Sequence, residues 1–499
     1  MRTYRNPIIP GFNPDPSICR VGEDYYLVTS SFEFFPGVPI WHSRDLVNWE
    51  NIGHVLTTAE QLPLENCRVS GGIYAPTLRY HDGLFYMITT NTHKGGNFLV
   101  TAENILGPWS EPVWINHEGI DPSLFWDEDG KVYYIGTWID GDDPQGIGQF
   151  EIDVKTGKKL SQTRIIWYGT GGRCPEAPHM YKFGDWYYLM IAEGGTEYGH
   201  MVTMARSKNV WGPFESCPRN PILSHRDDIC SPFQAVGHAD ITTDPQGNPY
   251  IFFHAIRPTN AQLHHIGRET MMAPFVWDEE GWPLVNGGKS VTAQMSAPGE
   301  GTALPESPWR DDFSGKSFHP RWTWLRNPDP GCYLQTENGL RLHGCDFTLD
   351  DLESPTFMGV RQRQLNGCYE TEMTAISEQG WAGITVFHTA EHHYDLRVKR
   401  QGSGYCVSLH RQAADMYMDS LPVVFENTDS LLLRLSADKN LYSFFAGTDP
   451  DHLTLIGTGR TQLLSTEAMP CTFTGCFVGL FAEGDGEATF RYFAATEET

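Results

Sequence analysis

Three carboxyls and one imidazole stand at or beside equivalent positions of a repeated pattern and could do acid–base chemistry together. Asp15, Asp121 and His238 each begin a copy of the pattern, and Glu176 directly precedes the start of another copy. Carboxylates held close together raise each other's pKa and cost stability, so such a grouping needs a functional reason. Glu176 has uncharged neighbours that favour a protonated carboxyl, whereas Asp15, near a solvent-filled opening, stays ionised more easily. A protonated carboxyl facing an ionised one is the pair that hydrolysis of a glycosidic bond requires.

Each of these residues taken alone also has a structural explanation. An Asp-Pro pair commonly begins a turn, which would account for Asp15 or Asp121. His238 could be a buried histidine with satisfied hydrogen bonds, and Glu176 could be a carboxylate of a surface loop. Their shared position in the repeat is what favours a common chemical role.

The repeated pattern predicts the architecture that would bring these residues together. Each of five copies has a short leading residue, a strand, a turn and a second strand that opens with aromatic residues. The copies begin at Asp15, Ala75, Asp121, Ala177 and His238, with spacings of 60, 46, 56 and 61 residues. Such spacings fit a four-stranded blade and predict a five-bladed β-propeller, in which the leading residues ring one mouth of the central channel. The alternative is a set of unrelated hairpins in an ordinary sandwich.

Composition supports an all-β chain and disfavours several classes of function. The 499 residues include 50 Gly, 33 Pro and 13% aromatic residues, a mixture typical of short strands and tight turns. The net charge of −26 disfavours binding to nucleic acid or to an anionic membrane surface. No apolar stretch is long enough for a membrane-spanning helix, no apolar leader is present, and the 11 Cys lack metal-site spacing. We therefore expect a cytoplasmic protein.

A stretch rich in Pro, Gly and Ser divides the chain into two parts. We expect a propeller catalytic domain over residues 1–291, a linker over 292–308, and a β-sandwich accessory domain of the jelly-roll, lectin-like type over 309–499.

Eight short motifs, most of them in or beside the repeats, together resemble one known family. They are 11–17 (GFNPDPS), 31–38 (SFEFFPGV), 70–76 (SGGIYAP), 121–125 (DPSLF), 176–179 (EAPH), 192–196 (AEGGT), 237–239 (GHA) and 267–270 (GRET). They resemble the family 43 glycoside hydrolases, in the branch of β-xylosidases and α-L-arabinofuranosidases that carry a C-terminal β-sandwich. The resemblance implies an inverting exo-glycosidase that releases terminal pentoses from xylo-oligosaccharides or arabinoxylan fragments, with β-xylosidase as the leading interpretation. An α-L-arabinofuranosidase or a bifunctional enzyme is the alternative within that chemistry, and a carbohydrate-binding protein without catalysis is the alternative of another class.

The resemblance also implies a role for each matching residue. Asp15 matches the general base, Asp121 the carboxylate that tunes the pKa and orientation of the acid, and Glu176 the general acid. The implied substrate-binding residues are Phe32, Tyr74, Trp138, Thr196, His238, Arg268 and Phe473.

Three departures from the family pattern bear on the pocket and on metal binding. Tyr74 stands where the family commonly has Trp, and Ala177 replaces a Gly of the acid motif. Residues 489–493 (TFRYF) lack two Asp that relatives often have, which weakens the case for a calcium site in the sandwich. We expect no required cofactor, while a calcium ion, the ligands of any metal and a homo-oligomer stay open. The expected partner is a small oligosaccharide.

Overall fold

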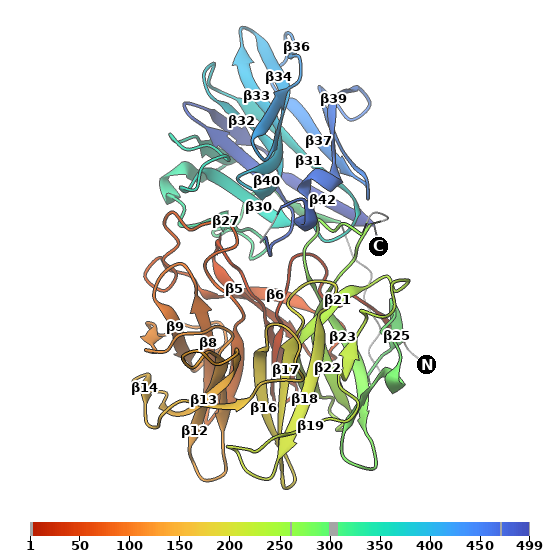
Figure 1. The fold of residues 1–499 in the computed structure, drawn as a ribbon. Helices are drawn as coiled ribbons and strands as arrows, with labels where there is room; N and C mark the ends of the chain where they lie inside the picture. Colours follow the sequence, from red (N-terminus) through yellow and green to blue (C-terminus); the bar gives the residue numbers. More distant parts are fainter. Residues whose placement is uncertain (1–2, 260–261, 299–307, 470–471, 499) are drawn as a thin grey trace.

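Nearly all of the chain is β-structure, arranged as two stacked bodies in the computed structural model (Figure 1). The structure describes residues 3–259, 262–298, 308–469 and 472–498. Helix within these residues is limited to the 3₁₀ turns η1 (Asn286–Gly288), η2 (Pro330–Cys332), η3 (Thr461–Leu464) and η4 (Thr466–Ala468). In the described part of the chain, none of these has the length or apolar character needed to cross a membrane.

The N-terminal body consists of five antiparallel blades, each with its first strand innermost. The first blade contains β2 (Ser17–Val21), β3 (Asp24–Val28), β5 (Gly37–Ser43) and β6 (Glu50–Leu56). The second contains β7 (Thr77–His81), β8 (Leu84–Asn91), β9 (Gly96–Ala102) and β10 (Val113–Trp114). The third contains β11 (Ser123–Trp126), β12 (Val132–Trp138), β13 (Gly146–Asp153), β14 (Lys158–Lys159) and β15 (Arg164–Trp167).

The fourth and fifth blades complete the ring. The fourth contains β16 (Glu176–Phe183), β17 (Trp186–Glu193), β18 (Met201–Ser207), β19 (Glu215–Ser216) and β20 (Leu223–Ser224). The fifth contains β21 (Gln234–Thr243), β22 (Pro249–Ile256), β23 (Glu269–Trp277) and β24 (Pro283–Val285). Contacts of β2 with β7, β7 with β11, β11 with β16, β16 with β21 and β21 with β2 close the ring of inner strands. The predicted five-bladed propeller is confirmed.

A short two-stranded sheet joins the two ends of the propeller sequence. β1 (Thr3–Arg5) pairs with β25 (Gln294–Ser296), with Tyr4 opposite Met295. β25 falls inside the stretch that we expected to be linker, because pairing with β1 satisfies its backbone groups. The propeller therefore extends to Ser296, and 299–307 of the expected linker lie outside the described residues.

The C-terminal body is a sandwich of two antiparallel sheets around a shared apolar core. The first sheet contains β26 (Trp309–Asp311), β28 (Tyr333–Thr336), β29 (Gly339–His343), β31 (Asn366–Ala375), β37 (Leu431–Ala437), β38 (Leu441–Gly447), β39 (Leu453–Arg460), β41 (Glu487–Phe490) and β42 (Phe493–Glu498). The second contains β30 (Thr356–Arg361), β32 (Trp381–Thr389), β33 (His392–Gln401), β34 (Gly404–Ala413), β35 (Met416–Asp419), β36 (Val423–Phe425) and β40 (Phe477–Glu483). The expected all-β sandwich is confirmed.

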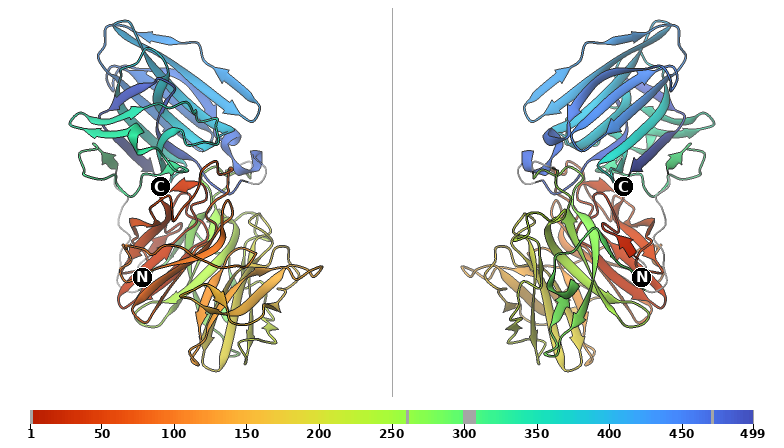
Figure 2. Two further views of the ribbon diagram at one scale, coloured as in Figure 1. Left: turned by 90° about the vertical axis from the view of Figure 1, so that its left-hand side faces the viewer. Right: turned by 90° about the vertical axis from the view of Figure 1, so that its right-hand side faces the viewer.

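The sandwich stacks on one end of the propeller, over the first and fifth blades (Figure 2). β27 (Trp324–Leu325) pairs directly with β4 (Phe34–Phe35), so one short sheet crosses the boundary. A buried aromatic cluster continues the contact, with the rings of Phe34 and Phe477 stacked at 4.0 Å between centroids. This apolar seam fixes the sandwich against the channel mouth.

Candidate active site

The same backbone conformation recurs just before or within four of the five innermost strands. Asp15 (φ 56°), Asp121 (φ 54°), Ala177 (φ 55°) and His238 (φ 51°) all lie in the left-handed region. This conformation costs a residue with a side chain roughly 1–2 kcal/mol, so its recurrence needs a compensating role. The turn brings repeat leaders together at one mouth, where Nδ1 of His238 lies 3.4 Å from Oδ1 of Asp15.

Asp15 is 4% exposed, and its carboxylate contacts four side chains. Nη1 of Arg268 donates to Oδ1 at 2.6 Å, and the hydroxyl of Ser30 donates to Oδ2. Nδ1 of His254 lies 3.0 Å from Oδ1, on the same side as His238. Burial alone would raise the pKa of Asp15, but the charge of Arg268 and the neighbouring imidazoles outweigh it and hold that pKa well below its usual range. Asp15 is therefore ionised at neutral pH.

Glu176 and Asp121 form a second group of carboxyls at the same mouth. Burial first, and then the charge of Asp15, raise the pKa of Glu176 to about 7. Burial first, and then the charge of Glu176, raise the pKa of Asp121 well above its usual range, although the backbone of Ala177 hydrogen-bonds to it. Two carboxyls that interact in this way, one buried and one partly buried, do not both ionise at neutral pH, so the Asp121–Glu176 pair retains a proton.

A buried carboxylate from the next strand fixes the loop that leads to Glu176. Glu193, at the end of β17, accepts hydrogen bonds from the amides of Thr170 and Gly172 at 3.0 and 2.8 Å. The turn after Glu193 carries Thr196, whose hydroxyl is buried with no hydrogen-bond partner among the described residues. Thr196 thus lies beside the segment that positions Glu176, with a hydroxyl available for a ligand.

Aromatic rings from both bodies form a wall next to Asp15. The rings of Phe32 and Tyr74 lie 5.1 Å apart, and Phe473 of the sandwich stacks on Phe32 at 6.1 Å. The amide of Phe473 donates to Oγ of Ser70 at 2.9 Å, and its carbonyl accepts from Nη2 of Arg268 at 3.4 Å. The structure therefore brings Phe32, Tyr74, Phe473 and Arg268 together, and the sandwich contributes directly to the site.

Trp138 lies apart from this aromatic wall. It ends β12 in the third blade and packs on the ring of His117 at 4.3 Å. A cavity that it lines with Gln145 lies beside the fourth blade, because Nε2 of Gln145 donates to the carbonyl of Pro175 at 3.1 Å. Trp138 therefore lies near the segment that carries Glu176. Phe32, in contrast, belongs to the segment of the first blade.

Sequence reasoning missed His254, Ser30 and His200. His254 is fully buried, and Nδ1 of His200 lies 3.2 Å from its Nε2. Burial first, and then the charge of Arg268, lower the pKa of His254 to about 3, so this imidazole is neutral beside Asp15. The sequence does mark His254 as unusual. At the equivalent position of the second strand, the other four repeats have a β-branched residue: Thr29, Thr89, Thr137 and Ile191.

One group of side chains at the mouth has donor atoms close enough to share a metal ion. These atoms, from Asp15, His238 and His254, lie within 4.8 Å of one another. Calcium prefers six to eight oxygen ligands, and Arg268 already donates to this carboxylate, so the set does not fit calcium. In the sandwich segment 489–493, Arg491 pairs with Glu372 at 2.7 Å and puts a cation where a calcium site would need carboxylates.

Comparisons with known proteins show similarity over nearly the whole chain. The model of glycosyl hydrolases family 43 matches residues 4–283, and the model of the beta xylosidase C-terminal concanavalin A-like domain matches 310–496. A non-reducing end alpha-L-arabinofuranosidase of Bacteroides ovatus is 41% identical over 98% of this chain and 92% of its own. A beta-xylosidase of Bacillus subtilis is 36% identical over 99% of both chains. The crystal structure of a xylan beta-1,4-xylosidase from Bacillus halodurans superposes with a TM-score of 0.93 at 33% identity, over 99% of this chain and 100% of that one.

Proposed function

Because the chain belongs to glycoside hydrolase family 43, it is a glycoside hydrolase, and we propose that it releases single terminal pentoses from xylo-oligosaccharides or arabinoxylan fragments with inversion at the anomeric carbon. The observation that carries the proposal is the opposite protonation of two carboxyls at one channel mouth. The pKa of Asp15 lies well below its usual range, and the pKa of Glu176 is raised to about 7. An inverting glycosidase needs one ionised and one protonated carboxyl in this way.

In the proposed reaction, the two carboxyls act on opposite faces of one sugar. Glu176 donates its proton to the departing glycosidic oxygen, and Asp15 removes a proton from the water that attacks the anomeric carbon. The transition state has oxocarbenium character, and room for the water requires carboxyls about 6.5–9.5 Å apart. The carboxyls of Asp121 and Glu176 interact, and the negative charge that a second ionisation would add keeps one proton on the pair at neutral pH.

Arg268 is proposed both to bind a sugar hydroxyl and to control the basicity of Asp15. Its guanidinium bonds to Asp15 and to the carbonyl of Phe473, so it lies between the base and the aromatic wall. A sugar hydroxyl that accepts from Arg268 weakens its hold on Asp15. The basicity of Asp15 then rises when a sugar is bound, which is when a base is needed.

The aromatic wall supports a site for one terminal sugar. Tyr74 and Phe473 are partly exposed and offer rings against which the apolar face of a pentose can pack, while the buried ring of Phe32 supports them from behind. Because Phe473 comes from the sandwich, the second body closes one side of the mouth, an arrangement that favours cleavage at a chain end.

The relatives favour both pentose specificities. Their names include beta-xylosidase, alpha-L-arabinofuranosidase and xylosidase/arabinosidase. We propose β-xylosidase activity first and α-L-arabinofuranosidase activity second, since both substrates are pentosides without a sixth carbon.

Two measurements test this proposal. Hydrolysis rates on an aryl β-D-xyloside and an aryl α-L-arabinofuranoside rank the two specificities, and NMR of the first product should show the inverted anomer. Asp15→Asn should abolish most of the turnover on these substrates, and Glu176→Gln should do so on xylo-oligosaccharides, whose leaving groups need a proton. Equal slow release by the wild type and both variants would instead favour a carbohydrate-binding protein without catalysis, and a retained anomer would contradict the assigned pair.

The proposal includes no metal and a cytoplasmic location. For calcium, the first point is supported by the two imidazoles at the mouth, which are not the oxygen ligands that calcium prefers, and ten free cysteines among the described residues support the second point. Activity should be unchanged after treatment with a chelator, and a loss that calcium restores would overturn the first point. Detection of the protein mainly outside the cytoplasm after cell fractionation would overturn the second.

A further inference from the structure

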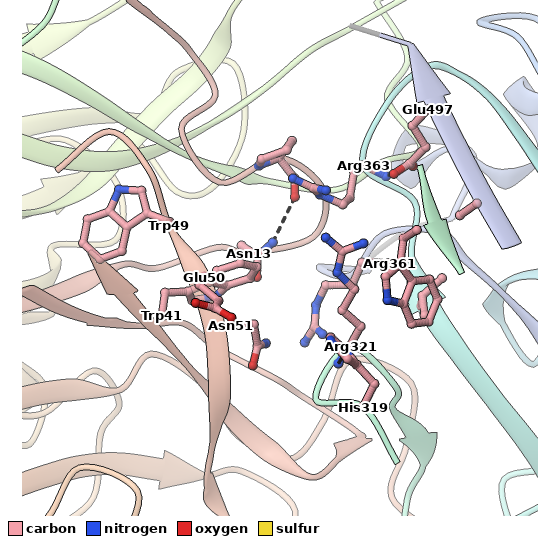
Figure 3. A pocket seen from close by; sticks show the side chains of 14 residues that line it. Asn13, Trp41, Trp49, Glu50, Asn51, His319, Arg321, Arg361, Arg363 and Glu497 are labelled. Atoms are coloured by element: carbon pink, nitrogen blue, oxygen red, sulfur yellow. Dashed lines mark hydrogen bonds between the residues drawn. The ribbon is translucent and has the colours of Figure 1, made fainter. Parts of the chain in front are cut away.

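A cavity of about 190 Å³ lies between the first blade and the sandwich (Figure 3). Trp41, Trp49 and Asn51 face it from the first blade, and Arg321 and Arg361 face it from the sandwich. None of the residues assigned above to the active site lines it. Its volume is several times the roughly 30 Å³ that one water occupies in the liquid, so it has room for a small organic molecule.

Arg361 brings a buried positive charge to the wall of this cavity. It is 8% exposed, and its Nε donates to the carbonyl of Phe12 at 2.8 Å. Its Nη2 is buried with no hydrogen-bond partner, and no carboxylate forms an ion pair with it in the described part of the chain. Burial lowers the pKa of Arg361 to about 10, with no acidic neighbour to offset the shift. A buried cation without a counter-charge is costly, and an anion in the cavity would remove that cost.

Two more side chains that line this cavity each have a buried polar atom without a partner. Nε1 of Trp41, on β5, is a donor with no acceptor among the described residues, and Oδ1 of Asn13 is an acceptor with no donor there. The orientation of Asn13 is fixed, because its Nδ2 donates to the carbonyl of Pro10 at 3.1 Å, the bond drawn in Figure 3. Buried polar groups are nearly always hydrogen-bonded, so these three atoms would be satisfied together by a molecule that carries both acceptors and a donor.

We propose that this cavity binds a small hydroxylated carboxylate, the chemical class of the sugar acids. The carboxylate accepts from Nη2 of Arg361, another ligand oxygen accepts from Nε1 of Trp41, and a hydroxyl donates to Oδ1 of Asn13. A neutral sugar would leave the buried guanidinium without a counter-charge. A simple anion would leave the carbonyl of Asn13 without a donor. The side chains of Trp49 and Trp309 also line the cavity, and their apolar surface suits the carbon skeleton of such a molecule.

The balance of charge around the cavity agrees with an anionic ligand. Arg321, Arg361 and Arg363 line it against two acidic residues, Glu50 and Glu497. Oε1 of Glu497 accepts from the amide of Arg363 and from the hydroxyl of Tyr369, both at 2.6 Å, and these neutral donors leave three guanidiniums against two carboxylates. The local excess of guanidinium therefore favours a carboxylate in spite of the acidic surface of the whole protein.

Calorimetric titration of the full chain tests the proposal, with D-glucuronate as the probe. D-glucose, acetate and inorganic phosphate are the comparison ligands, since they lack the charge, the hydroxyls or the carboxylate. D-glucuronate should bind at least about tenfold more tightly than each of them. If D-glucose bound equally well, the proposed contact between a ligand carboxylate and Arg361 would be wrong. If acetate or phosphate bound equally well, the proposed contact between a ligand hydroxyl and Asn13 would be wrong.

Variants locate the binding. Trp41→Phe keeps the aromatic ring and removes the unpartnered N–H, and Arg361→Gln removes the charge; each should weaken D-glucuronate binding about tenfold or more. Glu176→Gln, in the active site, is the matched control and should bind D-glucuronate as the wild type does. Loss of binding in Glu176→Gln with retention in Trp41→Phe would place the ligand in the active site and overturn the proposal, as would no binding by the wild type. Thermal unfolding checks that both cavity variants are folded. If Arg361→Gln does not fold, the result with Trp41→Phe still decides the test.

Discussion

Nη1 of Arg268 lies 2.6 Å from Oδ1 of Asp15, so the proposed base is ion-paired with the residue proposed to hold the sugar. The two residues are 253 positions apart and meet where the fifth blade closes against the N-terminal segment. The pair keeps Asp15 ionised, but it also makes the free carboxylate a weak base. Substrate binding therefore has to change this contact for catalysis to proceed.

Replacing Arg268 should move the acidic limb of the pH profile. Arg268→Gln removes the charge that opposes the effect of burial, so the pKa of Asp15 rises and kcat/KM begins to fall at a higher pH than in the wild type. We expect kcat/KM at the optimum to drop about 100-fold, because sugar contacts are lost as well. Arg268→Lys keeps the charge without the two-pronged geometry and should restore the position of the acidic limb but not the full rate. An unchanged acidic limb in Arg268→Gln would contradict this account.

Glu176 should define the basic limb. The pKa of Glu176 is raised to about 7, so kcat/KM should fall as the pH rises through that region and the acid loses its proton. Glu176→Gln should lower kcat by about 10²–10⁴-fold on substrates with a sugar leaving group and should abolish this limb. The loss should be smaller on aryl glycosides with acidic leaving groups, which need less protonation. An equal loss on both kinds of substrate would argue against a role as proton donor.

Phe473 should connect the sandwich to substrate binding. Phe473→Ala removes a ring that stacks on Phe32 but leaves the carbonyl that holds Arg268. We expect KM to rise about tenfold with a smaller change in kcat, in line with one lost aromatic contact. Tyr417→Ala changes a ring that is 73% exposed on β35 and should leave both constants unchanged. Normal KM in Phe473→Ala would show that the sandwich does not contribute to the pocket.

A buried ion pair in the sandwich should make stability depend on pH. His393 is fully buried, with Nδ1 3.0 Å from Asp395 and Nε2 2.9 Å from Asp350. Burial opposes the charged imidazole, but these carboxylates outweigh it and raise the pKa of His393 to about 9. Because the folded pKa exceeds the unfolded one, this stabilisation is fully present below about pH 6.5 and is lost as the pH rises through about 9.

Thermal unfolding between those two pH values measures the effect. The wild type should lose stability on the order of 3 kcal/mol over this range, whereas His393→Gln should start less stable and show a flatter profile. His452→Gln, which changes a histidine with a side chain 79% exposed, is the control and should follow the wild type. If the stability of the wild type and of His393→Gln fell in parallel with pH, the ion pair of His393 would not contribute to the pH dependence of stability.

Local pattern was enough to predict the propeller and part of the site. The leading residues recur at regular positions because four of the five blades carry the same left-handed turn just before or within the inner strand, and this turn is visible in sequence as a short residue before an apolar strand. Asp15, Asp121 and His238 could therefore be grouped at one mouth before any coordinates. His254 could have joined them, since it replaces Thr or Ile at an equivalent strand position. The extent of the linker was less predictable, because β25 exists only through its pairing with β1.

The sequence by itself determined the five blades, the sandwich and the carboxyls at the mouth, because these follow from periodicity within short segments. The tertiary structure alone decided that Arg268 holds Asp15, that Phe473 completes the aromatic wall, and that Arg361, Trp41 and Asn13 share one cavity. Each of these relationships joins residues brought together by ring closure or by docking of the two bodies. Contacts of that kind depend on the packing of whole surfaces, and no local pattern in the chain records them.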